Sequence, residues 1–202
     1  LSAVREQTSF PERFHIEERD LMFEMESLTS WVAQLRGRYG KLRGLVHSAG
    51  VTLTSPLREY DLAVARDIFD INFHAAMLLA KGFADRRNNT GSGASIVFIA
   101  AASAVIPTPS LLIYSAAKSA LLAAMRGMSK ELAPTGVRVN AISPGLVKTP
   151  MGDGYLELLG DGVADAMIQS YPLGLGEPGD VAGAAAYLLS AEARWITGQN
   201  LV

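Results

Sequence analysis

The chain has 202 residues, 49% of them hydrophobic, and its 18 basic and 20 acidic residues leave a formal net charge of -2. This suits one compact domain over residues 1–202, and the balanced charge gives no attraction for nucleic acid or an anionic membrane. The chain has no cysteine, its three histidines are too scattered for a metal site, and no apolar run reaches the roughly 18 residues that span a bilayer, so we expect a cytoplasmic protein that binds a small molecule.

Short runs rich in Val and Ile alternate with longer helical patterns, which is typical of a parallel sheet built from β-α-β units. The predicted strands are Arg13–Ile16, Leu45–His47, Ser95–Ala100, Arg138–Ile142 and one that begins near Asn200. The predicted helices are Glu26–Tyr39, Leu57–Arg87, Tyr114–Leu132 and Pro178–Leu188. We therefore expect an α/β fold with a doubly wound, Rossmann-like parallel sheet in a single domain.

The ligand-binding edge of such a sheet is predicted by the loop that follows the fourth strand. Pro144 and Gly145 stand just after that strand, and doubly wound sheets bind ligands at the carboxyl ends of their strands. The connection from Gly145 to Gly176 holds five further glycines, and its length predicts a mobile lid or substrate loop.

The sharpest chemical pattern is a tyrosine and a lysine four residues apart, Tyr114 and Lys118, at the start of a predicted helix. This spacing places both side chains on one helix face, one turn apart. A phenol with a pKa near 10 is a poor acid or base at neutral pH, but a neighbouring ammonium stabilises the phenolate and lowers that pKa. The pair therefore predicts a general acid/base, although the spacing alone also arises in ordinary surface helices.

Five segments in the same order resemble the short-chain dehydrogenase/reductase family over nearly all of the chain. They are the tyrosine and lysine helix together with 45–50 (LVHSAG), 70–73 (DINF), 137–145 (VRVNAISPG) with Thr149, and 196–202 (ITGQNLV). The general resemblance is to the 3-oxoacyl carrier-protein reductase-like branch of that family.

The resemblance implies roles for three side chains in catalysis. Tyr114 would donate the proton to a carbonyl oxygen in reduction, and Lys118 would lower its pKa and hydrogen-bond the nicotinamide ribose. Asn72 would hold a water that relays protons between the lysine and solvent. A helix asparagine that bonds to a backbone carbonyl is the simpler interpretation of Asn72, and the two roles are compatible.

The resemblance also implies contacts with the adenosine half of a dinucleotide. Asp20, expected near the end of a strand, would accept a hydrogen bond from the adenine, while a simple acid at a helix N-terminus is the alternative. Ala49 and Gly50 would let the backbone approach the adenine ribose, because only small residues permit that distance.

For the nicotinamide half, the resemblance implies that Pro144, Gly145 and Thr149 position the carboxamide. A helix cap is the alternative for Thr149. The cofactor would be NAD or NADP, and the sequence does not discriminate between them.

The chain departs from the family pattern at the serine that hydrogen-bonds the substrate carbonyl. The family places it thirteen residues before the tyrosine, and that position is Ala101, which has no donor. Loss of one donor to a developing oxyanion costs on the order of 3 kcal/mol, or about a hundredfold in rate. Ser103 would replace it if the loop is displaced locally, and a serine that bonds to its own loop backbone is the alternative.

A second departure is the glycine-rich phosphate loop of the family, which has no counterpart in this sequence, nor do the strand and helix that frame it. A sheet without that β-α unit would leave strand edges exposed. We therefore expect the natural polypeptide to carry residues before Leu1 and after Val202.

These patterns predict an oxidoreductase that transfers a hydride between a nicotinamide cofactor and a ketone or secondary alcohol. The alternative, favoured by Ala101, is a catalytically degenerate family member that binds cofactor or forms oligomers without turnover. The apolar and small residues of the predicted helices Leu57–Arg87 and Tyr114–Leu132 exceed what one sheet face covers, so we expect a homodimer or homotetramer.

Overall fold

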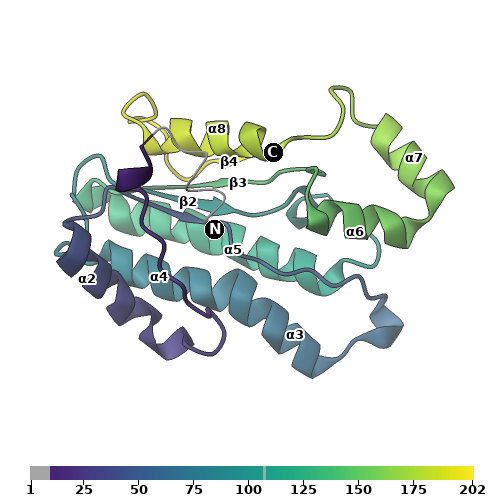
Figure 1. The fold of residues 1–202 in the computed structure, drawn as a ribbon, viewed down its shortest axis with the longest axis horizontal. Helices are drawn as coiled ribbons and strands as arrows, with labels where there is room; N and C mark the ends of the chain where they lie inside the picture. The colour runs from purple at the N-terminus through teal and green to yellow at the C-terminus, as the bar shows by residue number, and fades with distance from the viewer. Residues whose placement is uncertain (1–9, 107) are drawn as a thin grey trace.

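A four-stranded parallel sheet forms the centre of the molecule in a computed structural model that describes residues 10–106 and 108–202 (Figure 1). The strands stand in the order β1 (Gly44–His47), β2 (Ser95–Ile99), β3 (Arg138–Ile142) and β4 (Asn200–Leu201). In the register of the sheet, Gly44 lies opposite Ser95, which lies opposite Arg138. Four of the five predicted strands are therefore confirmed.

Helices cover both faces of this sheet, which confirms the doubly wound architecture (Figure 1). The helices on one face are α2 (Leu28–Tyr39), α4 (Ala75–Ala84) and α5 (Leu112–Leu132), and the helix on the other is α8 (Pro178–Leu189). Short 3₁₀ turns lie at Pro11–Arg13, Met25–Ser27, Leu57–Glu59, Ala102–Ala104 (η5) and Ala133–Thr135. None of the helices within the described ranges is long and apolar enough to cross a membrane.

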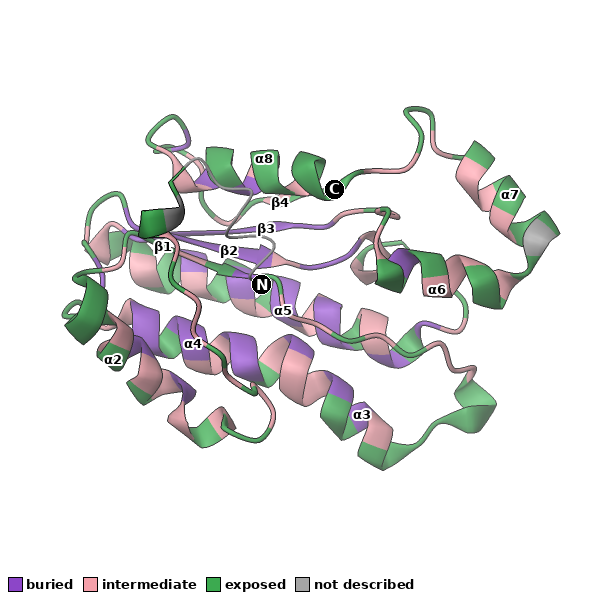
Figure 2. Cartoon of the chain, viewed as in Figure 1, coloured by how far each residue is buried: buried purple, intermediate pink, exposed green. Residues whose placement is uncertain are grey.

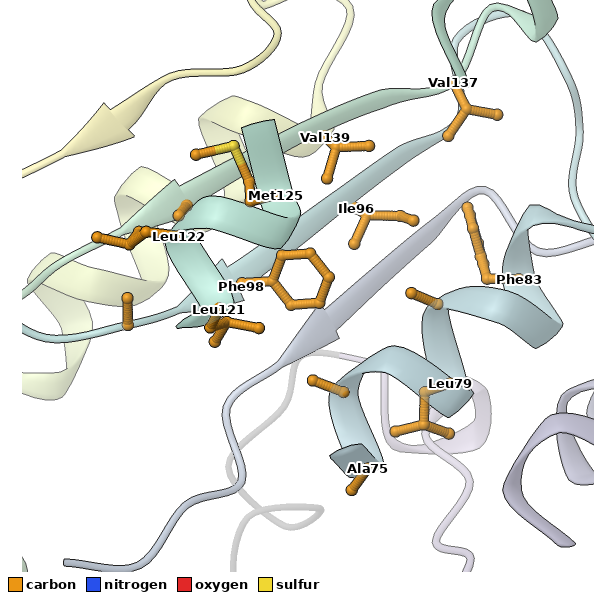
Figure 3. Packing of buried hydrophobic residues seen from close by; sticks show 14 of the residues in the cluster. Ala75, Leu79, Phe83, Ile96, Phe98, Leu121, Leu122, Met125, Val137 and Val139 are labelled. Carbon is orange, nitrogen blue, oxygen red and sulfur yellow. The ribbon is translucent and has the colours of Figure 1, made fainter. Parts of the chain in front are cut away.

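The larger part of the core lies between the sheet and α4 and α5. Phe98 of β2 and Leu121 of α5 are fully buried there, and Figure 3 shows them beside Leu79 and Phe83 of α4. Each large apolar side chain buried in this way contributes about 1.5–3 kcal/mol. Figure 2 shows that buried residues recur along α5, which packs against β3.

The predicted helix over residues 57–87 is divided into several elements. After α3 (Leu62–Phe69), a π-helical turn, η4 (Asp70–His74), leads directly into α4, which ends at Ala84. Such π turns are rare in proteins, and those that occur often lie at functional sites. The amphipathic pattern did not reveal this turn, because the chain stays helical on both sides of it.

The predicted strand Arg13–Ile16 is wrong. A 3₁₀ turn ends at Arg13, and residues 14–20 have no regular secondary structure. A strand exists only where a neighbour completes its hydrogen-bond ladder. Within the described ranges, β1 pairs with β2 alone, so this segment has no partner strand beside it.

The predicted lid between Gly145 and Gly176 contains two helices, α6 (Pro150–Leu159) and α7 (Asp161–Gln169). Its two ends are joined, because Lys148 N donates to Gly176 O at 2.9 Å and Gly176 N donates to Leu146 O at 3.1 Å. Figure 1 shows α6 beyond the carboxyl ends of β2 and β3. The lid is thereby anchored over the ligand-binding edge of the sheet.

Candidate active site

A cavity of about 260 Å³ opens at the carboxyl ends of β2 and β3, beneath the lid. Several residues predicted from the sequence line it, from four separate segments of the chain. These are Tyr114 of α5, Ser103 of η5, Pro144 and Gly145 after β3, and Thr149 at the start of α6. The structure therefore brings together most of the predicted nicotinamide-side residues in one cleft.

Tyr114 and Lys118 share one face of α5, as their spacing predicts. The Lys118 ammonium lies 5.7 Å from the centre of the Tyr114 ring and donates to Ile99 O at 2.9 Å. Burial lowers the pKa of Lys118 from 10.5 to about 8. Burial also raises the pKa of Tyr114, which is opposite in direction to the lowering expected from the lysine.

Asn72 is fully buried on the π turn, and its amide is held by two backbone carbonyls. The Nδ2 atom donates to Val51 O and Ile68 O, both at 2.8 Å. This confirms the backbone-bonded interpretation of this asparagine. Its Oδ1 atom is buried and has no hydrogen-bond partner within residues 10–106 and 108–202, so one acceptor remains for a polar group in the site.

The backbone of Gly50 lies close to the side chains of Asn72 and Lys118. A Cβ atom at this position would lie 2.6 Å from Asn72 Oδ1 and 3.2 Å from Lys118 Nζ. Any side chain here would displace both polar groups. Ala49 lies beside it but lines a different hollow, between β1 and α2, so the structure places these two small residues on separate surfaces.

Ser103 is held in the cleft by the hydrogen bonds of its turn. Ala102 N donates to Pro144 O at 2.8 Å, and Ser119 Oγ of α5 donates to Ala104 O at 2.9 Å. The Ser103 hydroxyl is buried, lines the cavity and has no hydrogen-bond partner among the described residues. Ala101 lines the same cavity, so the serine stands two residues from the alanine in one wall.

The loop after β3 is fixed by Tyr171, which lies at the end of the lid. Its hydroxyl accepts a hydrogen bond from Leu146 N at 3.0 Å, and a Cβ on Gly145 would lie 2.8 Å from its ring. Thr149 caps α6 by accepting from Gly152 N at 3.2 Å, which confirms the alternative interpretation of this threonine. A carboxamide contact of Pro144, Gly145 and Thr149 remains a prediction.

Asp20 does not lie at the end of a strand, contrary to the prediction. Its exposed carboxylate accepts hydrogen bonds from Met22 N at 2.9 Å and Phe23 N at 3.0 Å. Asparagine and aspartate commonly close turns in this way. Both hydrogen bonds use Oδ1, and an adenine contact of Asp20 remains a prediction.

Two further buried polar residues, one near Lys118 and one in the cavity wall, were not predicted from the sequence. His47 ends β1 with 2% exposure, and neither ring nitrogen has a hydrogen-bond partner in the described part of the chain. The Thr52 hydroxyl lines the cavity and is likewise buried without a partner there. The sequence offered one indication of these two residues, which is that they lie in and just after the LVHSAG segment. The prediction from that segment used only its small residues.

A nicotinamide and its ribose fit the cleft together with the polar residues behind Tyr114. The buried ammonium of Lys118, the open acceptor of Asn72 and the close approach at Gly50 suit a ligand with hydroxyl groups. The described residues show no glycine-rich phosphate loop at this edge, and they contain no group of three acidic or histidine side chains placed to hold a metal.

The comparisons with known proteins show which family the chain is similar to. The family model described as enoyl-(acyl carrier protein) reductase matches residues 18–202. An uncharacterised oxidoreductase of Methylorubrum extorquens is 36% identical over 163 residues, or 80% of this chain, and a dehydrogenase/reductase SDR family member 4 of Caenorhabditis elegans is 33% identical over 172 residues, or 82% of it. The chain spans 64% of the length of each of these two relatives.

Solved structures share the fold. A 4-hydroxyisoleucine dehydrogenase complexed with NADH is 27% identical, with a TM-score of 0.85 over 99% of this chain and 81% of its own. An NAD⁺-bound xylitol dehydrogenase is 28% identical, with a TM-score of 0.79 over 87% of this chain and 73% of its own. From the matched model and these relatives, the chain belongs to the short-chain dehydrogenase/reductase family.

Proposed function

We propose that the protein is an NAD- or NADP-dependent oxidoreductase that transfers a hydride between the cofactor and a ketone or secondary alcohol. The observation that carries this proposal is the cleft itself. Tyr114 and the unpartnered hydroxyl of Ser103 line it, with the buried ammonium of Lys118 directly below the tyrosine. The structural relatives with bound NADH and NAD⁺ support the choice of cofactor.

In reduction, the substrate carbonyl would face the hydroxyls of Tyr114 and Ser103. A nicotinamide cofactor held in the cleft would supply the hydride for the carbonyl carbon and would be the group that is oxidised. Tyr114 donates its proton to the carbonyl oxygen, and Ser103 donates a hydrogen bond that stabilises the developing negative charge. The product is the alcohol, and Tyr114 is left as a phenolate near the buried ammonium of Lys118, which lies 5.7 Å from the centre of its ring.

Reprotonation of Tyr114 requires a route to solvent, and the cluster below it supplies the groups. Lys118 Nζ and Asn72 Oδ1 both approach the same point beside Gly50. With an acceptor on Asn72 and a donor on Lys118, these residues would order a water and pass a proton toward the lysine. The relay predicted from the family resemblance therefore remains part of the proposal.

A cofactor-binding or oligomer-forming subunit without turnover is the second candidate, and Ala101 favours it. The donor that the family places at this position is absent from the cleft wall. The position of the Ser103 hydroxyl in the same wall favours the enzyme instead, because an unpartnered buried hydroxyl costs stability unless a ligand uses it.

We also propose a single-domain cytoplasmic protein that forms homodimers or homotetramers. Exposed apolar side chains near the start of α3 and α5, Leu57, Leu62 and Leu112, support association, since they lie outside the core. Light scattering at micromolar concentration tests this, and a monomer would contradict it.

The experiment for the proposed function is a cofactor-oxidation assay on the natural protein with a panel of ketones and either NADH or NADPH. Turnover by the parent protein, with none by Tyr114→Phe, supports the enzyme. Cofactor binding without turnover of any ketone by the parent protein supports the second candidate.

A further inference from the structure

The side chains around the cavity carry no formal charge. Among the described residues that line it, none is an aspartate, glutamate, lysine, arginine or histidine. Its apolar part comes chiefly from Leu111, Leu146, and the lid residues Met151 and Met167. An ionised group in such a surrounding loses its hydration without gaining a partner.

The nearest basic side chains are already engaged elsewhere. Lys118 points to Ile99 O and is 3% exposed. Lys148, on the loop between the cleft residues Val147 and Thr149, is exposed and forms an ion pair with Glu177 at the start of α8. The cleft therefore has no free cation to hold a carboxylate or a phosphate.

The polar side chains that line the cavity are all hydroxyl-bearing, and two of these hydroxyls have no hydrogen-bond partner among the described residues. Thr52 Oγ1, from the loop after β1, and Ser103 Oγ, from the turn after β2, are both buried without a hydrogen-bond partner among the described residues, and both residues line the cavity. With Tyr114, they form a donor set suited to a neutral oxygen. Among the other hydroxyls, that of Thr149 accepts from Gly152 N and donates to Val147 O, and that of Tyr171 accepts from Leu146 N.

The lid closes the other side of the cavity with large uncharged side chains. Met151 and Tyr155 come from α6, and Met167 comes from α7. Burial raises the pKa of Tyr155, as expected for a phenol in a surrounding that disfavours charge. Thioether and aromatic side chains adapt well to alkyl and aryl groups.

We infer that this cleft binds uncharged ketones with alkyl or aryl substituents, and that it disfavours ketones that carry a carboxylate or phosphate. The carbonyl of the ketone would face Thr52, Ser103 and Tyr114. The inference rests on the proposed function, because it names the substrate class of that same site. It also assigns Thr52 as a second hydrogen-bond donor to the substrate.

A matched pair of aryl ketones tests the inference directly. The probes are para-acetylbenzoate and its methyl ester, which share the reacting carbonyl and differ in one charge. Protein labelled with ¹³C at the methionine methyl groups is titrated with each ketone in the presence of cofactor, and Met151→Leu and Met167→Leu assign the two lid signals. We expect the ester to shift both signals and the acid, at the same concentration, to leave them in place.

Equal shifts with the acid, or no shift with the ester, would overturn the inference whether or not the protein turns over. If the ester shifts the signals but neither ketone is reduced, the ligand class stands and the proposed function fails. If both ketones are reduced with equal kcat/KM, the function stands and the inference fails.

Turnover provides the second measurement. We expect kcat/KM for the ester to exceed that for the acid at least about tenfold, because the acid must desolvate its carboxylate without a partner. Met167→Lys should narrow this ratio by roughly tenfold by supplying a cation from the lid. Leu173→Lys is the matched control, because it adds the same charge at a fully exposed position outside the cleft and should leave the ratio unchanged.

Discussion

The Lys118 ammonium donates a hydrogen bond of 2.9 Å to the carbonyl oxygen of Ile99, the last residue of β2. This bond joins the helix that carries Tyr114 to the strand that precedes the Ser103 turn. A charged side chain with 3% exposure is costly to bury, and this single hydrogen bond offsets only part of that cost. The position of the lysine is therefore explained by function better than by stability.

Replacement of Lys118 by methionine should stabilise the fold while it weakens cofactor binding. The pKa of this lysine is about 8 in the folded chain and about 10.5 in the unfolded one, so below pH 8 the folded state bears the full cost of the buried ammonium, about 3 kcal/mol. Between pH 8 and 10.5 the unfolded chain binds the extra proton, and the stability of the parent rises with pH.

Lys118→Met should therefore have a free energy of unfolding about 1–3 kcal/mol higher than that of the parent at pH 7. This difference should become smaller toward pH 10. Urea unfolding at both pH values measures it. Lys130→Met, at an exposed position of the same helix, is the control and should show no such change. A variant that is less stable than the parent at pH 7 would contradict the buried-charge argument.

His47 should make the protein sensitive to acid. Burial, with the nearby charge of Lys118, lowers the pKa of His47 from 6.5 to about 4. Between these pH values His47 is protonated in the unfolded chain and neutral in the folded one. The free energy of unfolding therefore falls by about 3 kcal/mol as the pH drops through this window. In His47→Asn that loss should be absent, and unfolding midpoints at pH 7 and pH 4.5 measure it. His74→Asn, at an exposed position, is the control, and equal acid losses in both variants would contradict the assignment.

Gly50→Ala should weaken cofactor binding and destabilise the fold by about 1–3 kcal/mol. The new methyl group would meet Asn72 Oδ1 at 2.6 Å, so the asparagine and Lys118 must move. Gly127→Ala is the control, because among the described residues no atom other than its chain neighbours and the nearby backbone of its own helix lies within 4 Å of the added methyl, and alanine favours a helix. Thermal unfolding and cofactor titration measure both variants, and parental behaviour of Gly50→Ala would refute the close approach.

Ala101→Ser and Ser103→Ala, measured side by side, identify the donor to the substrate oxygen. If Ser103 serves this role, its removal lowers turnover by tens to a hundredfold, about 2–3 kcal/mol, and Ala101→Ser changes little. A large gain from Ala101→Ser with no loss from Ser103→Ala would show that Ser103 is a structural residue and that the missing donor limits the enzyme. If both variants match the parent on every ketone while cofactor still binds, hydride transfer by this cleft is refuted.

Elements with strong local patterns were predictable from the sequence. The strand Arg138–Ile142 has the predicted bounds, and α5 begins two residues before the predicted Tyr114 and ends at the predicted Leu132. Both bury apolar residues in a regular order, which a single sequence displays. The segment Arg13–Ile16 has a strand-like composition, but its state depends on a neighbouring strand that composition does not report.

The site was predictable in its residue types and not in its orientations. The spacing of Tyr114 and Lys118 gave their shared helix face, whereas the bond from Lys118 to Ile99 depends on where α5 packs along β2. The two carbonyl partners of Asn72 depend likewise on the π turn and on the loop at Val51. Three-dimensional packing decides such contacts.

The most direct test of the hydride-transfer account is the turnover of Tyr114→Phe with a ketone that the parent protein reduces. The substitution removes one hydroxyl and keeps the ring over which Lys118 lies, so the folded state and cofactor affinity should be unchanged. The account predicts that kcat falls at least about a hundredfold. Turnover within tenfold of the parent, by a variant that binds cofactor normally, would contradict it.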